Sequence, residues 1–463
     1  MSWGSWLTGA PADAASKPNF QPITSLPQNE LFGPLTPGDL EWTCAGGFTT
    51  ETQVWYTLLP DGAFASSQII HSSVGLWYPQ IQFTFKYFNP KTGQKIWKSV
   101  AVTKFVTPPP AGSGRDKNKS YDKRSSKSDQ FSVLHDTLPD GSESYEISAS
   151  FDQEVQIAYT YTRPAAAKGW KLGAGREGGK SIFGSNPDSP DGYVVHRFWP
   201  QAKTSGHLII KGSLVDAAGN GMFIHAIQGM RPNLVASTWN FANFQSDALG
   251  GVAAILMQFT TTPQYGEAKP EAEQQQAAAA QTGAGRVAAA LTGPERERVT
   301  VTIGSITVGG QLVAIAGSTA VKGSLLPSTS QTNVEHLNAV QDPETGYPAP
   351  QQIKYVWDAP ALDPASGKGK SATQVKAELA TDLGVPYPSS ATKGLIEKVD
   401  LLGEMPAVVK KLVNYAAGTK PFIYQTMNPA KLALILPEGT AAGEPGSHTV
   451  DGVLFEEHTF ISE

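Results

Sequence analysis

The sequence has very little cysteine. Cys44 is the single cysteine in 463 residues, so no disulfide can form within the chain. This usage agrees with a reducing compartment, and no motif of a catalytic thiol surrounds Cys44. The sequence therefore indicates no thiol chemistry.

Charge is also scarce. Charged residues make up 17% of the chain, the formal net charge is −5 and the isoelectric point is near 6.0. A nucleic-acid-binding domain is normally clearly basic, so this balance argues against nucleic acid as a partner. Small molecules or proteins are the expected partners.

Long apolar runs are missing as well. The longest, residues 252–257, falls far short of the ~20 residues that span a bilayer. The start of the chain has no basic stretch followed by an apolar one, so it does not predict a secretory signal. These absences predict a cytosolic protein, unless another feature tethers it to a membrane.

The usual signatures of catalysis and metal binding do not occur in the sequence. The closest histidine pairs, His196 with His207 and His448 with His458, have no carboxylate or cysteine at ligand spacing. There is no G-x-S-x-G nucleophile motif. We therefore predict no metal, no cofactor and no catalytic residue.

One glycine motif imitates a nucleotide-binding loop. Gly173, Gly175 and Gly178 spell G-x-G-x-x-G, and Gly179 is followed by Lys-Ser as in a phosphate-binding loop. However, a loop separates the motif from the preceding predicted strand, and Pro187 and other breakers forbid the helix that would hold a phosphate. We expect no nucleotide at this motif.

What the sequence does have is glycine, proline and aromatic residues. The 46 glycines and 34 prolines are typical of a turn-rich, mostly β protein, and the length predicts two domains. The central stretch contains three predicted strands, at residues 222–228, 238–245 and 252–262. In the second, Trp239 and Phe241 point to one side and Asn240 and Phe244 to the other. Aromatics on both faces favour two layers of protein or a closed barrel.

Further strands and loops complete the pattern. The clearest alternation, residues 81–87, predicts a half-buried strand, and two similar sets of strands suggest a duplicated architecture. Residues 406–417 predict a helix in the C-terminal half. Residues 11–40 predict a surface linker, while residues 108–129 and 266–298 predict disordered or flexible insertions.

The first ten residues predict a short amphipathic helix. Trp3, Trp6 and Leu7 share one side and Ser2, Ser5 and Thr8 lie opposite, without lysine or arginine. So short a helix forms only against an apolar surface, which could be lipid. The alternatives are a tail that docks on its own domain and a disordered end.

Several longer motifs resemble one known family. In the central stretch they are residues 221–224 (GMFI), 228–232 (QGMRP), 239–241 (WNF) and 259–261 (FTT). Elsewhere they are residues 80–85 (QIQFTF), 196–200 (HRFWP), 334–338 (VEHLN), 417–425 (AGTKPFIYQ) and 459–463 (TFISE). The motifs are long and cover both halves in the family's order, and the chain resembles the fungal oxidative-stress survival factor family.

The resemblance implies a fold, a location and a function. It implies two tandem lipocalin-like antiparallel β barrels, at residues 41–218 and 219–463, preceded by a membrane-binding segment and linker at residues 1–40. It implies a carrier that moves ceramide from endoplasmic reticulum to Golgi and supports survival under oxidative stress. We therefore expect a cytoplasmic protein, peripheral on both membranes, with the nucleus left open as a further location.

Candidate residues follow from the apolar strands. The predicted lining of a lipid cavity is Trp77, Phe83, Phe85, Phe223, His225, Trp239 and Phe244, and the predicted membrane contacts are Trp3, Trp6 and Leu7. One alternative is a lipocalin-like hydratase or cyclase, in which His71 or His225 would be the general acid or base. Another is a stress-response scaffold without a ligand.

Overall fold

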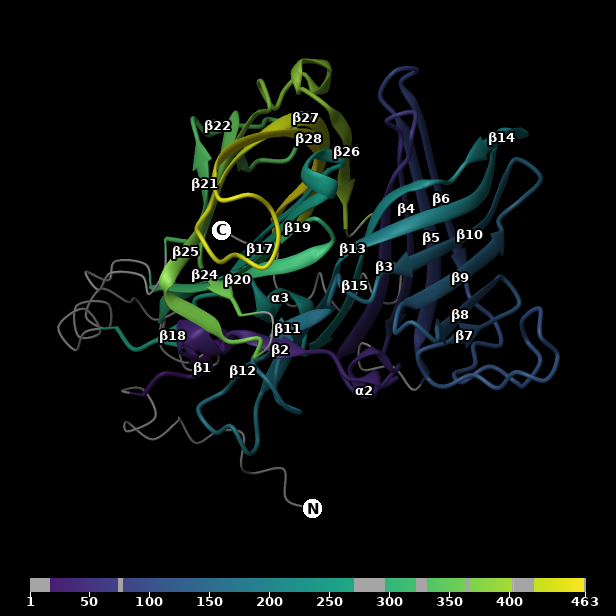
Figure 1. Cartoon of the computed structure of the whole chain (residues 1–463), viewed down its shortest axis with the longest axis horizontal. Coiled ribbons are helices and arrows are strands. Elements are labelled where there is room, and N and C mark those ends of the chain that lie inside the picture. Colours follow the sequence, from purple (N-terminus) through teal and green to yellow (C-terminus); the bar gives the residue numbers. More distant parts are fainter. Residues whose placement is uncertain are drawn as a thin grey trace, which may run out of the picture.

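The computed structural model shows a protein built almost entirely of antiparallel strands (Figure 1). It describes residues 17–73, 78–269, 296–321, 331–363, 366–401, 403 and 420–461. No helix in this described part has both the length and the apolar character that a membrane crossing needs. The expected helix at residues 406–417, Trp77 and the membrane contacts Trp3, Trp6 and Leu7 lie outside the described residues.

The first sheet is a curved half-barrel with the strand order β6-β5-β4-β3-β15-β13-β10-β9-β8-β7. These strands are β3 (Thr49–Leu58), β4 (Phe64–Ser72), β5 (Gln80–Asn89), β6 (Gln94–Ala101), β7 (Ser126–Lys127), β8 (Phe131–Thr137), β9 (Glu143–Ser150), β10 (Val155–Arg163), β13 (Gly192–Ile210) and β15 (Gly219–Gly229). Strand pairing does not join β6 to β7, but the Phe83 and Phe131 rings meet across the interior at 4.9 Å between centroids. Beyond the end of β6, Val106 exchanges two backbone hydrogen bonds with Lys127 of β7.

The second sheet closes into an eight-stranded barrel, because β17 pairs with both β16 and β19. The barrel strands are β16 (Thr238–Ser246), β17 (Val252–Thr260), β19 (Glu297–Val308), β20 (Gln311–Val321), β24 (Gln352–Leu362), β25 (Gly369–Asp382), β27 (Phe422–Leu436) and β28 (Gly446–Phe460). Around it lie β18 (Gly266–Glu267), β21 (Asn333–Leu337), β22 (Val340–Gln341), β23 (Pro348–Ala349), β26 (Leu395–Asp400) and the 3-10 turns η3 (Ala248–Gly250) and η4 (Ser389–Ala391). The expected mostly-β, lipocalin-like architecture is confirmed, with one barrel closed and the other open.

The boundary between the sheets differs from the expected one. β15 is hydrogen-bonded between β3 and β13, so the first sheet extends to Gly229, past the boundary expected at residue 218. The one-turn helix α3 (Pro232–Val235) then leads into β16. The division into residues 1–40, 41–218 and 219–463 as separate domains stays a prediction.

The stretch expected to be a surface linker is largely built into the fold. Residues 20–40 form β1 (Phe20–Gln21), η1 (Ile23–Ser25), η2 (Gln28–Glu30), β2 (Phe32–Pro34) and α2 (Pro37–Leu40). Of these, β1 pairs with β12 (Lys180–Phe183) and β2 pairs with β11 (Trp170–Leu172). Elsewhere in the sheet, β14 (Ser213–Asp216) pairs antiparallel with β13. Phe20, Leu31 and Leu40 are each at most 2% exposed, so this linker prediction is wrong for residues 20–40.

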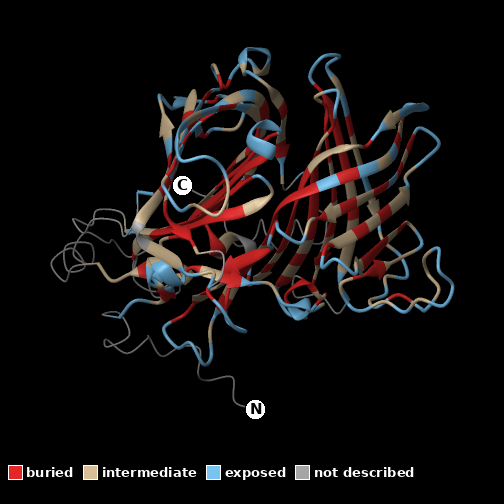
Figure 2. Cartoon of the chain, in the orientation of Figure 1, coloured by how far each residue is buried: buried red, intermediate tan, exposed pale blue. Residues whose placement is uncertain are grey.

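The two sheets share a core, which explains aromatics on both faces of the central strands. Phe64 of β4 stacks on Phe455 of β28 at 4.3 Å, and Tyr56 of β3 contacts Phe241 of β16 at 5.4 Å. Figure 2 shows the buried residues running through both sheets. For the same reason β5 is more than half buried: its inner residues face the half-barrel, and Lys86 on its outer face reaches Glu397 of β26 at 2.8 Å.

Candidate ligand-binding site

The inner face of the half-barrel is dominated by four aromatic side chains, which we call the aromatic box. Directly paired residues of antiparallel strands share a face, and Phe223 is paired with Trp199 of β13 on one side and Trp55 of β3 on the other. Tyr145 reaches them from β9. Neighbouring rings lie 5.0–5.4 Å apart between centroids, and all four residues are 0% exposed.

The box contains polar atoms that the protein does not pair. Among the described residues, none forms a hydrogen bond with Nε1 of Trp55, Nε1 of Trp199 or the hydroxyl of Tyr145. Buried donors of this kind normally have a partner, and each unpaired one costs about 1–3 kcal/mol of stability. Two indole N–H groups and a phenol hydroxyl in the box are therefore free to donate to a bound group.

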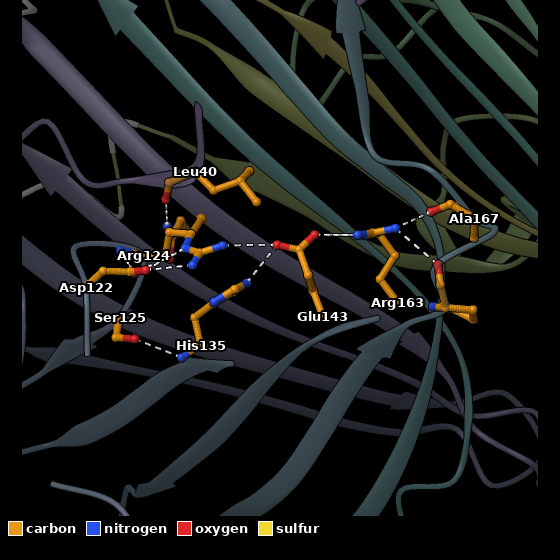
Figure 3. Close-up of polar contacts among 10 residues, drawn as sticks. Leu40, Asp122, Arg124, Ser125, His135, Glu143, Arg163 and Ala167 are labelled. Atoms are coloured by element: carbon orange, nitrogen blue, oxygen red, sulfur yellow. Dashed lines mark hydrogen bonds and ion pairs between the residues drawn. The ribbon is translucent and has the colours of Figure 1, made fainter. Parts of the chain in front are cut away.

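A compact charged network borders the box, and Figure 3 shows it centred on Glu143. Oε1 of Glu143 lies 3.1 Å from Arg124 Nη1 and 3.2 Å from His135 Nε2, while Oε2 accepts from Nε of Arg163 at 3.2 Å and, more closely, from its Nη2. Arg124 also pairs with Asp122 at 2.6 Å. Burial alone would raise the pKa of Glu143, but the hydrogen bonds from His135 and Arg163 outweigh it and lower the pKa to about 2.

The positive and negative charges of this network balance one another beside the aromatic rings. Arg163 lies over the Trp199 ring at 5.5 Å, and His135 contacts Tyr145 at 4.9 Å between centroids. Burial lowers the pKa of His135, so its ring stays neutral at physiological pH. Two guanidinium groups thus face two carboxylates, and no net charge is offered to a ligand in the box.

The predicted candidates do not all lie in one place. Phe83, Phe85, Phe223 and His225 share the inner face of the half-barrel, and Phe223 belongs to the aromatic box. Trp239 lies on the outer face of β16 against His196 and Phe259, whereas Phe244 points into the closed barrel. One cavity cannot therefore be lined by both Trp239 and Phe244, which face opposite sides of β16.

His225 is held by protein groups on both ring nitrogens. Nε2 lies 2.8 Å from Oε1 of Glu51, and Nδ1 lies 2.9 Å from the carbonyl oxygen of Asp39, which can only accept, so Nδ1 carries hydrogen. Glu51 also accepts hydrogen bonds from Thr43 and Cys44. These contacts anchor the segment before β3, and they leave His225 only its ring faces for a ligand.

The glycine motif has a packing role. Gly173 and Gly178 lie in the turn between β11 and β12, where a Cβ on Gly178 would approach the Gly173 carbonyl oxygen to 2.1 Å. A Cβ on Gly33 would approach the same oxygen to 1.9 Å. Only glycine permits this backbone approach. Among the described residues, no group of three His, Cys, Asp or Glu side chains is placed to hold a metal ion.

Comparisons with known proteins place the chain in a family. The family model described as "Svf1 family" matches residues 3–462. The chain belongs to the Svf1 family. Two Svf1 relatives carry the name "Ceramide-binding protein svf1": that of Schizosaccharomyces pombe, 28% identical over 99% of this chain and 98% of its own, and that of Aspergillus fumigatus, 28% identical over 88% and 82%.

Among solved structures, this Svf1 family member is similar to CghA in complex with Sch210972, with a TM-score of 0.49 and 11% identity, covering 96% of this chain and 98% of that one. It is also similar to kievitone hydratase from Nectria haematococca, with a TM-score of 0.45 and 11% identity, covering 96% and 99%.

Proposed function

We propose that the chain binds ceramide or a closely related uncharged lipid and carries it between membranes without changing it. The names of the Svf1 relatives support the ligand class. The observation that carries the proposal is the set of three unpaired donors, from Trp55, Tyr145 and Trp199, inside an apolar sheet. Ceramide combines long hydrocarbon chains with a small head that bears an amide carbonyl and hydroxyls, which matches an apolar site with a few polar groups.

The electrostatics of the box favour a neutral head group. The indole and phenol donors can satisfy a carbonyl oxygen, while Arg163 beside the Trp199 ring is already bound to Glu143. A phosphate or carboxylate would have to compete with Glu143 for that cation, and in a buried site the loss of one partner costs several kcal/mol. Uncharged sphingolipids are therefore preferred over anionic ones.

The four rings touch one another, so entry of a lipid requires them to move. Contacts of 5.0–5.4 Å between centroids leave no room for a hydrocarbon chain between the rings. Binding must turn at least Trp199 or Trp55 to another rotamer, which should change the tryptophan fluorescence. A scaffold that never binds a ligand is the competing function, because the same close contacts would suit it.

The decisive experiment pairs two tyrosine variants. Tyr145→Phe removes an unpaired hydroxyl, so we expect unchanged or higher stability without lipid and about tenfold weaker ceramide binding. Tyr159→Phe is the matched control: its hydroxyl, also buried in the half-barrel, donates to Ser67 at 2.6 Å, so it should lose about 1 kcal/mol of stability and keep its affinity.

Binding is followed by tryptophan fluorescence and by mass spectrometry of co-purified lipids. Equal affinities of the two variants would contradict the assignment of the site. The absence of any sphingolipid across preparations would favour the scaffold, and recovery of a chemically altered lipid would favour the hydratase or cyclase alternative.

We also propose, from the sequence, that the carrier works in the cytoplasm between endoplasmic reticulum and Golgi and supports survival under oxidative stress. We propose that it contacts membranes through Trp3, Trp6 and Leu7. The Trp6→Asp variant should leave the membrane fraction without a change in melting temperature, since burial of Trp6 in lipid would stabilise binding by ~1.5–3 kcal/mol. A large fall in melting temperature would instead make the segment part of the fold.

A further inference from the structure

The closed barrel contains a buried histidine that the protein leaves unpaired. His458 of β28 is 1% exposed, and among the described residues none forms a hydrogen bond with either ring nitrogen. Its direct cross-strand partners are Asn240 of β16 and Tyr424 of β27, so the three share the inner face of the barrel.

The polar neighbours of His458 are committed to one another. His336 Nε2 lies 2.7 Å from Oδ1 of Asn240, whose Nδ2 donates to Gln258 Oε1 at 3.1 Å. Gln258 in turn donates to Asn333 at 3.0 Å. The rings of His336 and His458 are nearly perpendicular, with centroids 5.9 Å apart. Turning Asn240 or Gln258 toward His458 would break these bonds.

A second polar group lies one step further into the barrel. Glu456 is on the same face of β28 and 0% exposed, and it accepts hydrogen bonds from the Tyr355 hydroxyl at 2.8 Å, from Thr426 Oγ1 at 3.0 Å and from the Thr381 side chain. A carboxylate has about four lone-pair positions, one more than these three donors use. Glu456 therefore remains able to accept from a group placed between it and His458.

The layer is bounded on both sides by apolar side chains. Leu454 lies on the same face beyond Glu456 and is 0% exposed. On the other side Phe460 stacks on Tyr347 at 5.1 Å between centroids. A ligand at His458 is therefore confined to a short segment of the barrel, which limits its polar part to a few atoms.

A phenylalanine would occupy the position of His458 without burying unpaired nitrogens, so the fold gives no reason for a histidine here. A neutral imidazole has one donor and one acceptor nitrogen, and its complement is a group that both accepts and donates. Burial and the neighbouring His336 hold the pKa of His458 well below its ordinary value, so the ring offers no positive charge to an anion.

We propose that the layer formed by His458, Asn240, His336 and Glu456 is a second ligand site, which takes a small uncharged group bearing a hydroxyl or a secondary amide. It lies in the other barrel from the aromatic box and does not depend on the lipid proposed there.

The test uses the full chain with its histidine rings labelled with nitrogen-15. The probe is N-acetylethanolamine, which has a secondary amide and a hydroxyl, and the charged comparators are acetate and ethylammonium. We expect the uncharged probe alone to shift the ring resonances of His458, which are identified by their loss in His458→Phe. The control is His448→Phe on the same strand, where the half-buried ring bonds to the Glu444 carbonyl at 2.7 Å.

Two further readouts separate a binding site from a structural histidine. His458→Phe should melt at a higher temperature than the wild type without probe and bind the probe at least about tenfold more weakly, while His458→Gln, which keeps a donor and an acceptor, should retain part of the binding. No probe-dependent shift at His458, an equal shift with acetate or ethylammonium, or a lower melting temperature of His458→Phe overturns the proposal. Ceramide binding that depends on Tyr145 should be unaffected by His458→Phe, so the two proposals fail separately.

Discussion

The Glu143 network makes a quantitative prediction about acid. The folded pKa of Glu143 is lowered to about 2, against an ordinary value of 4.5, and its side chain is 17% exposed. One pKa unit corresponds to about 1.36 kcal/mol, so ionised Glu143 contributes roughly 3 kcal/mol of stability. Because the folded pKa is depressed, this contribution is fully present above pH 4.5 and is lost as the pH falls toward 2.

The perturbation is Glu143→Gln, compared with the wild type at several pH values. At pH 7 the variant should be less stable by roughly 3 kcal/mol, because Arg163 loses the one carboxylate that pairs with it among the described residues, while Arg124 keeps Asp122. Between pH 4.5 and pH 3 the gap between wild type and variant should shrink by about 2 kcal/mol, since the wild type loses the same contribution there.

Urea unfolding followed by tryptophan fluorescence measures both free energies. The control is Glu146→Gln on the same strand, whose exposed ion pair with Arg115 at 3.2 Å should contribute less than about 1 kcal/mol at any pH. Asp39 and Glu51 also have lowered pKa values, but their titration cancels in the difference between wild type and variant. A gap that stays constant from pH 7 to pH 3 would show that Glu143 is not held ionised by its partners, and the reasoning would fail.

Two further predictions concern the segment before β3. Glu51 is 0% exposed and bonds to His225, Thr43 and Cys44, so Glu51→Gln should lower the unfolding free energy by about 3–5 kcal/mol in the same assay, and an unchanged midpoint would contradict the ion pair. Burial and then the charge of Glu51 raise the pKa of Cys44 to about 11, against an ordinary 9.0, so iodoacetamide at pH 8 should react about a hundredfold more slowly than with an unperturbed thiol. Reaction at the ordinary rate would refute that environment.

Local patterns in the sequence were sufficient to predict that a segment forms a strand and to predict one of its buried faces. Phe83, Phe85 and Tyr87 alternate with polar residues, and this period correctly predicts that they face a core. The burial of Lys86 and Phe88 on the other face could not be predicted, because it arises from the second barrel lying against β5. The alternation of apolar and polar residues predicts which face of a strand is buried, but it does not show whether another part of the fold covers the opposite face.

Composition misled the prediction for residues 108–129. The stretch is rich in proline, glycine, serine and lysine, which favours disorder, yet Ser125 and Ser126 are 0% exposed and Arg124 joins the Glu143 network. The backbone N–H of His135 donates a hydrogen bond to Oγ of Ser125 at 2.8 Å, which adds to the anchoring. One long-range ion pair can order a polar segment, and single-sequence composition carries no signal for it.

The aromatic box was missed for a related reason. Phe223 was a candidate because it lies in the central apolar stretch, whereas Trp55 and Trp199 are distant in the sequence and become its neighbours only through the register of β3, β15 and β13. Tyr145 arrives from a fourth strand. Phe223 lies in the predicted strand at residues 222–228, but the pairing order that brings the other three rings to it was not available from local patterns.

Consecutive residues of the strands that form the shared core face in opposite directions, toward and away from the two proposed sites. On β3, Trp55 faces the aromatic box while its neighbour Tyr56 faces the other way and contacts Phe455 at 5.4 Å. On β28, Phe455 lies in this interface while its neighbour Glu456 faces the interior of the closed barrel. Neighbouring residues of β3 and β28 therefore face different interiors, so the two proposed sites can be altered by separate variants.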